Sequence, residues 1–294
     1  MSTEHRREIL VGIDGSDGSA AALRWAYETA QIEKRPVTAL LGWTADGLPR
    51  SVYEAAVAAN HQALTEAAAE QLERTIARIP APVPPVEVRK LVVNQDPVEA
   101  LVSAAKNAEM TVVGQRGAGL VHRILAGSVA HRLLHHSSGP VVVVRGTPPD
   151  TGNAPDRRPI IVGVDGSEPS QAAVRWAAAR AQERGVALHL VNGYRIDVTT
   201  FGVPVPDFYP SLRTGSEQLL KDVATADLDD ESAVQVSLEA VDDSASHALL
   251  QAAEQAQLLV VGTRGRGGFA ELVLGSTAHQ CVLHAACPVA VIHA

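Results

Sequence analysis

The chain contains two of its motifs twice, and this repetition constrains the fold more than any other feature. "VGIDGSDGSAAALRWA" at Val11–Ala26 aligns with "VGVDGSEPSQAAVRWA" at Val162–Ala177, and eleven of the sixteen positions are identical. Farther along, "VGQRGAGLVHRILAGS" at Val113–Ser128 aligns with "VGTRGRGGFAELVLGS" at Val261–Ser276. Each copy spans about 140 residues, the size of a domain rather than of a solenoid unit. We therefore expect two related domains.

A segment without apolar periodicity separates the two copies. "GTPPDTGNAPDRRP", from Gly146 to Pro159, contains four prolines and two glycines. Segments of that composition act as exposed linkers. We predict a first domain over 1–146, a linker over 147–158 and a second domain over 159–294.

Short apolar runs alternate with helical stretches in each copy. In the first copy we expect strands at "EILVGID", "PVTALLGW", "PVEVRKLVV", "MTVVG" and "PVVVV". Between them we expect a helix beginning at Ser16 or Asp17, a long helix over 51–79, a helix capped by Asp96 and a helix over about 128–136. The second copy repeats this order.

This alternation predicts an open α/β fold with a parallel sheet. Right-handed crossovers place helices on both faces of such a sheet, and a run such as "VVVV" suits a strand buried on both faces. Open parallel sheets bind ligands outside the carboxyl ends of their strands. Asp14 and Gly114 fall at strand ends in the first copy, as do Asp165 and Gly262 in the second. We expect a ligand beside these residues.

Charge and composition exclude several classes of protein. The formal net charge of −8 argues against broad binding to nucleic acid or to anionic membranes. No apolar run approaches the ~20 residues of a membrane span, and from the polar first residues we expect no signal peptide. Cys281 and Cys287 match neither a redox CxxC motif nor a disulfide framework. We expect a cytoplasmic protein with two semi-buried, reduced thiols.

Each glycine loop follows one strand and precedes one helix, as phosphate-binding loops do. Glycine lets the backbone approach an anion closely, and successive N–H groups form an anion nest. The helix after Gly127 adds N–H donors and a partial positive charge, and Arg116 could bind a phosphate oxygen. The nine residues between the glycine clusters would arch over the ligand. The alternative is a set of turn glycines only, and the recurrence of the same positions in both copies favours phosphate binding.

Two familiar phosphate motifs do not match. The Walker A motif requires a lysine after its last glycine, and no lysine follows Gly127 or Gly275. "GRGGFA" over 265–270 formally fits a dinucleotide fingerprint, but it follows the fourth strand of its copy rather than the first.

Two further groups would complete a nucleotide site. Asp14 and Asp165 could accept a hydrogen bond from a ribose hydroxyl or hold a metal on the phosphates. Alternatively, each caps the next helix, unless the neighbouring serine does so. We expect an apolar slot for adenine at the end of the second strand, around Leu40–Leu41 and Leu190–Val191.

These residues resemble the universal stress protein family in its tandem-domain, ATP-binding form. The family motif G-2x-G-9x-G-[ST] is matched by Gly114, Gly117, Gly127 and Ser128, and again from Gly262 onwards. The resemblance implies two tandem open five-stranded parallel sheets with strand order 3-2-1-4-5, an adenine-nucleotide alpha-hydrolase-like fold. It further implies one ATP per domain, with Mg or Mn, and little or no turnover.

The candidate binding residues are therefore the two Asp strand ends, the slot positions and the loops. They are Gly12, Asp14, Leu41, Val113, Gly114, Arg116, Gly117, Gly119, Arg123, Gly127, Ser128, Val129, Gly163, Asp165, Val191, Val261, Gly262, Arg264, Gly265, Gly267, Gly275, Ser276 and Thr277.

Other polar residues give weaker signals. His131 and His135 are four residues apart on an expected helix and could grip a metal, but no third ligand accompanies them. Histidines that are solvated or cap a helix end are the favoured interpretation. No GxSxG motif and no repeated Ser/His/Asp set is present, so we predict no catalytic residue. Trp25 and Trp176 are expected in the cores.

The resulting hypothesis is an ATP-binding regulator of stress or dormancy with an unidentified protein partner. A slow ATPase or phosphotransferase and a nucleotide-free interaction module are the alternatives. The last strands, "PVVVV" and "PVAVI", are expected at sheet edges. We predict that the two copies pack pseudo-symmetrically along them and that the chain forms a homodimer.

Overall fold

The computed structural model divides into two compact units, Met1–Pro148 and Pro149–Ala294. The residues that it describes are 7–44, 50–115, 117, 127–146, 156–195, 208–228, 233–265 and 274–293.

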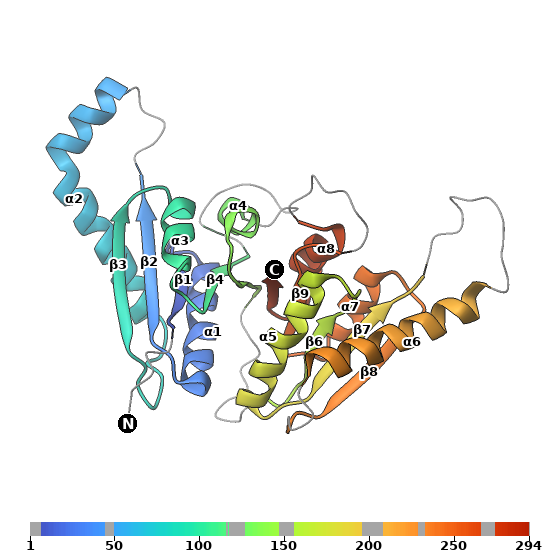
Figure 1. Cartoon of the computed structure of the whole chain (residues 1–294). Coiled ribbons are helices and arrows are strands. Elements are labelled where there is room, and N and C mark those ends of the chain that lie inside the picture. Colours follow the sequence, from blue (N-terminus) through green and yellow to red (C-terminus); the bar gives the residue numbers. More distant parts are fainter. Residues whose placement is uncertain are drawn as a thin grey trace. The chain divides into compact units, whose positions relative to one another are not determined.

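The first unit alternates strands and helices along the chain (Figure 1). Its elements are β1 (Ile9–Gly12), α1 (Asp17–Glu33), β2 (Val37–Trp43), α2 (Arg50–Ala77), β3 (Val88–Asn94), α3 (Pro97–Ala105), β4 (Met110–Gly114), α4 (Ser128–His136) and β5 (Val141–Val144). The strands lie in the order β3-β2-β1-β4-β5, and each adjacent pair is parallel.

The second unit repeats this arrangement. Its elements are β6 (Ile160–Gly163), α5 (Glu168–Arg184), β7 (Leu188–Gly193), α6 (Phe208–Asp227), β8 (Val236–Val241), α7 (Ala245–Ala253), β9 (Leu258–Gly262), α8 (Ser276–His284) and β10 (Val289–Ile292). Its parallel strands lie in the order β8-β7-β6-β9-β10. The predicted order 3-2-1-4-5 is thus confirmed in both units.

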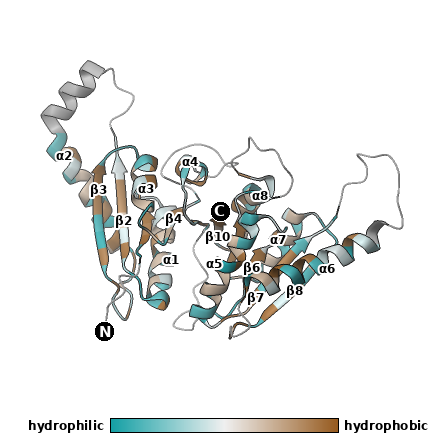
Figure 2. Ribbon diagram, in the orientation of Figure 1, coloured by the Kyte–Doolittle hydropathy of each residue, from teal (hydrophilic) through white to brown (hydrophobic). Residues whose placement is uncertain are grey.

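Helices cover both faces of each sheet, and the core lies between these layers. In the first unit α1 and α2 contact each other on one face, whereas α3 and α4 contact each other on the opposite face. The central strands are buried, with Leu10 and Val112 each 0% exposed. The outer strands β3 and β8 carry hydrophilic as well as hydrophobic residues (Figure 2). Burial on both faces explains why the inner strands read as unbroken apolar runs.

Side-chain caps fix where several helices begin. The Ser16 hydroxyl accepts from the Ser19 N–H and caps α1, and Ser167 caps α5 in the same way through Ser170. The Asp96 carboxylate caps α3, which opens with Pro97. A cap supplies an acceptor for N–H groups that have no partner within the helix. The predicted choice between Ser16 and Asp17 is therefore settled in favour of Ser16.

Three details complete the fold. Trp25 is only 5% exposed and lies in the core as predicted, whereas Trp176 is half-buried beneath the Arg180 guanidinium, 4.4 Å from its ring centroid. Cys281 and Cys287 are 0% and 4% exposed, so the expectation of semi-buried thiols was wrong. Among the helices described, none has both the length and the apolar character needed to cross a membrane.

Candidate functional site

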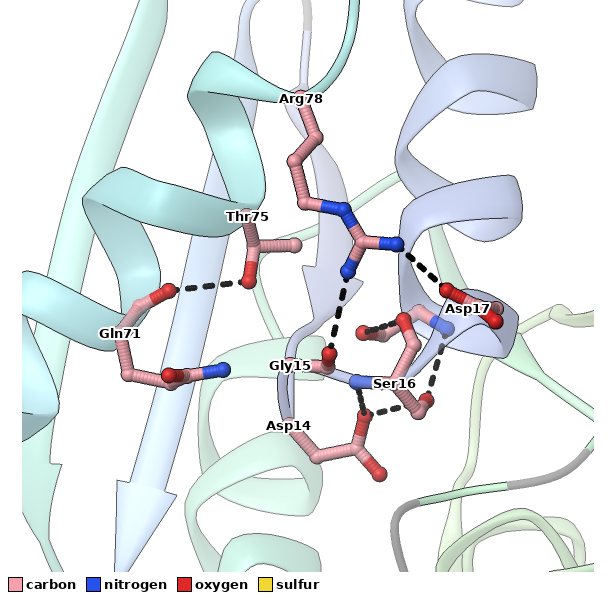
Figure 3. Close-up of polar contacts among 8 residues, drawn as sticks. Asp14, Gly15, Ser16, Asp17, Gln71, Thr75 and Arg78 are labelled. Carbon is pink, nitrogen blue, oxygen red and sulfur yellow. Dashed lines mark hydrogen bonds and ion pairs between the residues drawn. The ribbon is translucent and has the colours of Figure 1, made fainter.

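The carboxylate of Asp14 is held at the end of β1 by the turn that follows. Gly15 has a φ of 84°, which glycine adopts readily, and it turns the chain toward α1. Ser16 donates to Asp14 Oδ1 from its backbone N–H at 3.0 Å and from its hydroxyl at 2.6 Å (Figure 3). Because Ser16 also caps α1, Asp14 is not the helix cap. The contacts from Ser16 therefore orient the Asp14 carboxylate, and this carboxylate does not cap α1.

Helix α2 lies next to the turn formed by Asp14, Gly15 and Ser16 (Figure 3). A Cβ on Gly15 would lie 1.8 Å from Gln71 Nε2 of α2. Arg78, just beyond α2, donates to the Gly15 carbonyl at 3.5 Å and to Asp17 at 2.5 Å. This packing could not be predicted from the sequence, because nothing in the pattern of α2 identifies the turn that the helix contacts.

The first glycine loop meets Asp14 from the neighbouring strand β4. A Cβ on Gly117 would lie 2.5 Å from Asp14 Oδ2, closer than real Cβ atoms approach another atom. Only glycine at 117 therefore lets the loop backbone lie against this carboxylate undisturbed. Gly114 has a related role, because a Cβ there would lie 2.4 Å from the carbonyl carbon of Gly18 in the first turn of α1.

The far end of the same loop returns to β4 and opens a helix. The Gly127 N–H donates to the Gln115 carbonyl at 2.7 Å, which ties the two ends of the loop together. Gly127 is the N-cap of α4 and supplies no side-chain cap, unlike Ser16 and Asp96 at α1 and α3. The first turn of α4 thus presents backbone N–H groups and the positive end of a helix dipole near the carboxyl end of β4.

The second unit builds the same arrangement from its own residues. Ser167 donates to Asp165 Oδ1 at 3.0 Å from its N–H and at 2.6 Å from its hydroxyl. A Cβ on Gly265 would lie 2.3 Å from Asp165 Oδ2. The Gly275 N–H donates to the Thr263 carbonyl at 2.7 Å, and Gly275 opens α8 without a side-chain cap.

The structure brings most of the predicted residues to the carboxyl edge of each sheet. Val113 and Gly114 end β4, and Val261 and Gly262 end β9. Beside them lie the loop and helix-start residues, which are Gly117, Gly127, Ser128, Val129, Arg264, Gly265, Gly275, Ser276 and Thr277. Arg116, Gly119, Arg123 and Gly267 lie outside the described residues.

Gly12 and Gly163 end the central strands and have a packing role. A Cβ on Gly12 would lie 3.0 Å from Leu101 Cδ1 of α3, and one on Gly163 would lie 2.8 Å from Leu249 Cδ1 of α7. These glycines let a helix approach the strand that carries the Asp.

The two positions predicted for the adenine slot are not counterparts. Gly12 pairs with Leu40 and Gly163 pairs with Val191, so Val191 corresponds to Leu40 rather than to Leu41. Leu41 and Val191 are 6% and 1% exposed. The counterpart of Leu41 is Asn192, which the sequence analysis did not single out. The strand register identifies Asn192 as the counterpart of Leu41, whereas the two copies are too dissimilar in sequence at this point to do so.

The residues considered for a metal form no complete site. On α4, His131 Nε2 and His135 Nε2 are 3.3 Å apart. Within the described residues, no group of three or more His, Cys, Asp or Glu side chains could hold a metal ion. Among the described residues, Asp14 and Asp165 supply the carboxylates that the loop glycines Gly117 and Gly265 approach.

Comparison with known proteins identifies the family. The sequence pattern described as the universal stress protein family matches residues 5–145 and 156–293. The chain belongs to this family. A universal stress protein from Mycolicibacterium smegmatis is 34% identical over 286 residues, which cover 97% of this chain and 96% of the relative. The universal stress protein fold is also seen in a crystal structure from Archaeoglobus fulgidus, with a TM-score of 0.62 and 21% identity over 97% of this chain and 98% of that one.

Some solved universal stress proteins contain nucleotides. One is in complex with cAMP, and one from Archaeoglobus fulgidus is in complex with dAMP. Each covers less than half of this universal stress protein, with a TM-score of 0.33, so this likeness carries no argument about its ligand.

Proposed function

We propose that each unit of this universal stress protein binds one ATP at the carboxyl edge of its sheet. The observation that carries the proposal is the twofold recurrence of one arrangement. In each unit a glycine loop lies against an oriented Asp carboxylate, and the helix after the loop begins without a side-chain cap. Glycine loops and uncapped helix starts of this kind suit phosphate groups.

In this proposal each part of the site has a separate task. The loop backbone, with Gly127–Ser128 or Gly275–Ser276, would hold the phosphates. Asp14 or Asp165 would accept from the ribose hydroxyls or hold a cation on the phosphates. Mg²⁺ commonly binds through one or two carboxylates together with substrate phosphates and waters, so the Asp carboxylate of each site could serve Mg²⁺ or Mn²⁺.

We further propose that the bound nucleotide regulates the protein, in keeping with a role in stress or dormancy, with little or no turnover. In this proposal the two domains span 1–146 and 159–294, and 147–158 joins them. The cytoplasmic location, the homodimer and the pairing of the units along β5 and β10 stay predictions from the sequence.

Analysis of co-purifying nucleotide tests this proposal. The purified chain is denatured, and the released small molecules are separated by anion exchange and identified by mass. About two unhydrolysed ATP per chain is the expected result. ADP alone would favour the slow ATPase, and no nucleotide, with no binding of added ATP and Mg²⁺, would contradict the proposal.

A further inference from the structure

The second strands of the two units end with different residues at equivalent places. Since Leu40 and Val191 are counterparts, the next residues along, Leu41 and Asn192, are counterparts as well. The following glycines confirm the register. A Cβ on Gly42 would lie 2.8 Å from Pro97 Cα, and one on Gly193 would lie 2.8 Å from Ala245 Cα, at the first residues of α3 and α7. An apolar side chain in the first unit is thus replaced by an amide in the second.

The Asn192 amide joins β7 to the turn after β6 and to α6. Its Nδ2 donates to the Val164 carbonyl at 2.5 Å, and its Oδ1 accepts from the Ser216 hydroxyl at 2.6 Å. A carbonyl oxygen can only accept, so the amide nitrogen must face Val164. Ser216 is 5% exposed, and these bonds therefore hold the amide in one orientation against Val164, the residue before Asp165.

The partner of this amide is also exchanged between the units. The shared spacing of buried residues aligns the two helices. Leu72 and Thr75 of α2 are each 1% exposed, and Leu220 and Val223 of α6 are 1% and 4% exposed. Four residues before Leu72 and Leu220, about one helical turn away, are Ala68 and Ser216. Leu41 and Ala68 of the first unit therefore correspond to Asn192 and Ser216 of the second unit.

The strand order places Asn192 where a nucleotide base would lie. In the second unit β6 lies between β7 and β9. Asp165 follows β6, the glycine loop follows β9, and Asn192 is at the end of β7. If phosphates bind at the β9 loop and the ribose at Asp165, the base extends toward β7. The first unit has Leu41 at that place.

We propose that Asn192 makes the second site selective for adenine, whereas the first site distinguishes adenine from guanine weakly. The proposal rests on the proposed function. An amide has two donors and two acceptor lone pairs, and the contacts to Val164 and Ser216 use one of each. Adenine presents an amino group beside a ring nitrogen, which matches Oδ1 and Nδ2 of an Asn. Guanine presents a carbonyl oxygen in place of that amino group.

Calorimetric titration of the full chain with ATP and with GTP, both with Mg²⁺, tests this inference. Gly117→Val blocks the first site so that the second is read alone, and Gly265→Val does the converse. We expect the ATP-to-GTP affinity ratio at the second site to exceed that at the first by about tenfold, the size of one good bidentate contact.

Two paired exchanges provide matched variants. Asn192→Leu with Ser216→Ala copies the first unit into the second, and it avoids leaving a buried hydroxyl without its acceptor. In the Gly117→Val chain it should lower the ATP-to-GTP ratio by about tenfold. Leu41→Asn with Ala68→Ser in the Gly265→Val chain should raise the ratio, and this gain does not depend on the folding of the other variant.

The outcomes distinguish a failure of this inference from a failure of the proposed nucleotide binding. Equal ratios at the two sites, or ratios that neither exchange alters, would overturn the role of Asn192 while leaving nucleotide binding in place. No binding of ATP or GTP by the unsubstituted chain would overturn both. The inference is supported if the second site prefers ATP to GTP, and if this preference is lost with Asn192→Leu and gained with Leu41→Asn.

Discussion

Gly117 and Asp14 come from different strand ends, yet a Cβ on Gly117 would lie 2.5 Å from Asp14 Oδ2. The second unit repeats this relationship between Gly265 and Asp165, at 2.3 Å. The same approach of a loop glycine to an Asp carboxylate in both units is the basis for proposing one site in each unit of this universal stress protein.

Ser16 is expected to support both the fold and the site. Ser16→Ala removes the cap of α1 and the hydroxyl that bonds Asp14 Oδ1. The free energy of unfolding should fall by about 1 kcal/mol, as for other lost N-caps. ATP affinity at the first site should fall several-fold, because the carboxylate loses one of its two Ser16 contacts. Urea denaturation and calorimetry measure these effects. The exposed Ser103→Ala on α3 is the control and should change neither.

A side chain at position 15 is expected to lower stability, for two separable reasons. Gly15→Ala places a Cβ at a φ of 84° and 1.8 Å from Gln71 Nε2. Gly185→Ala is the matched control, because its φ is 62° but nothing lies within 4 Å of the added Cβ. The control should cost about 1 kcal/mol in the free energy of unfolding, from the left-handed backbone alone. Gly15→Ala should cost more, and equal losses would show that Gln71 simply moves away.

Arg78 is expected to contribute little to stability despite its short contact with Asp17. The two side chains are 53% and 92% exposed, and exposed ion pairs contribute between ~0 and 1 kcal/mol. Arg78→Ala should therefore lower the free energy of unfolding by less than about 1 kcal/mol, and the effect should shrink in high salt. A larger loss in urea denaturation would mean that the contact with the Gly15 carbonyl fixes the turn.

The cysteines are expected to be unreactive in the folded chain. Burial raises the pKa of Cys281 and of Cys287 from 9.0 to about 12. At pH 8 only about 10⁻⁴ of each thiol is then thiolate, the nucleophilic form. A thiol reagent should label both residues slowly in the native protein and rapidly in denaturant. Fast labelling of the native chain would contradict their burial.

The same pKa shifts set the sign of a pH effect on stability. Above about pH 9 the unfolded chain loses thiol protons that the folded chain retains, so the unfolded state binds fewer protons. The cysteine contribution to stability is therefore fully present below pH 9 and is lost as the pH rises toward about 12. Replacing both cysteines by Ser should flatten urea-denaturation stability over this range.

The sequence predicts the architecture well because local signals and the global fold agree. The apolar runs identified the strands, and Asp96–Pro97 and Ser16 marked two helix starts that the structure confirms. The contact of Gln71 with Gly15 could not be predicted, because it depends on how α2 packs after a long crossover. Asn192 was missed because it is recognised as the counterpart of Leu41 only after the pairing of Gly163 with Val191 fixes the strand register.

The central claim is that each glycine loop, with its Asp, forms one nucleotide site. Equilibrium dialysis of the full chain against labelled ATP with Mg²⁺ tests it most directly, using Gly117→Val, Gly265→Val and the double variant, with Gly139→Val as the control because nothing lies within 4 Å of a Cβ there. We expect two ATP bound to the unsubstituted chain and to the control, one to each single variant and none to the double variant. Two ATP still bound to the double variant, or none bound to the unsubstituted chain, would contradict it.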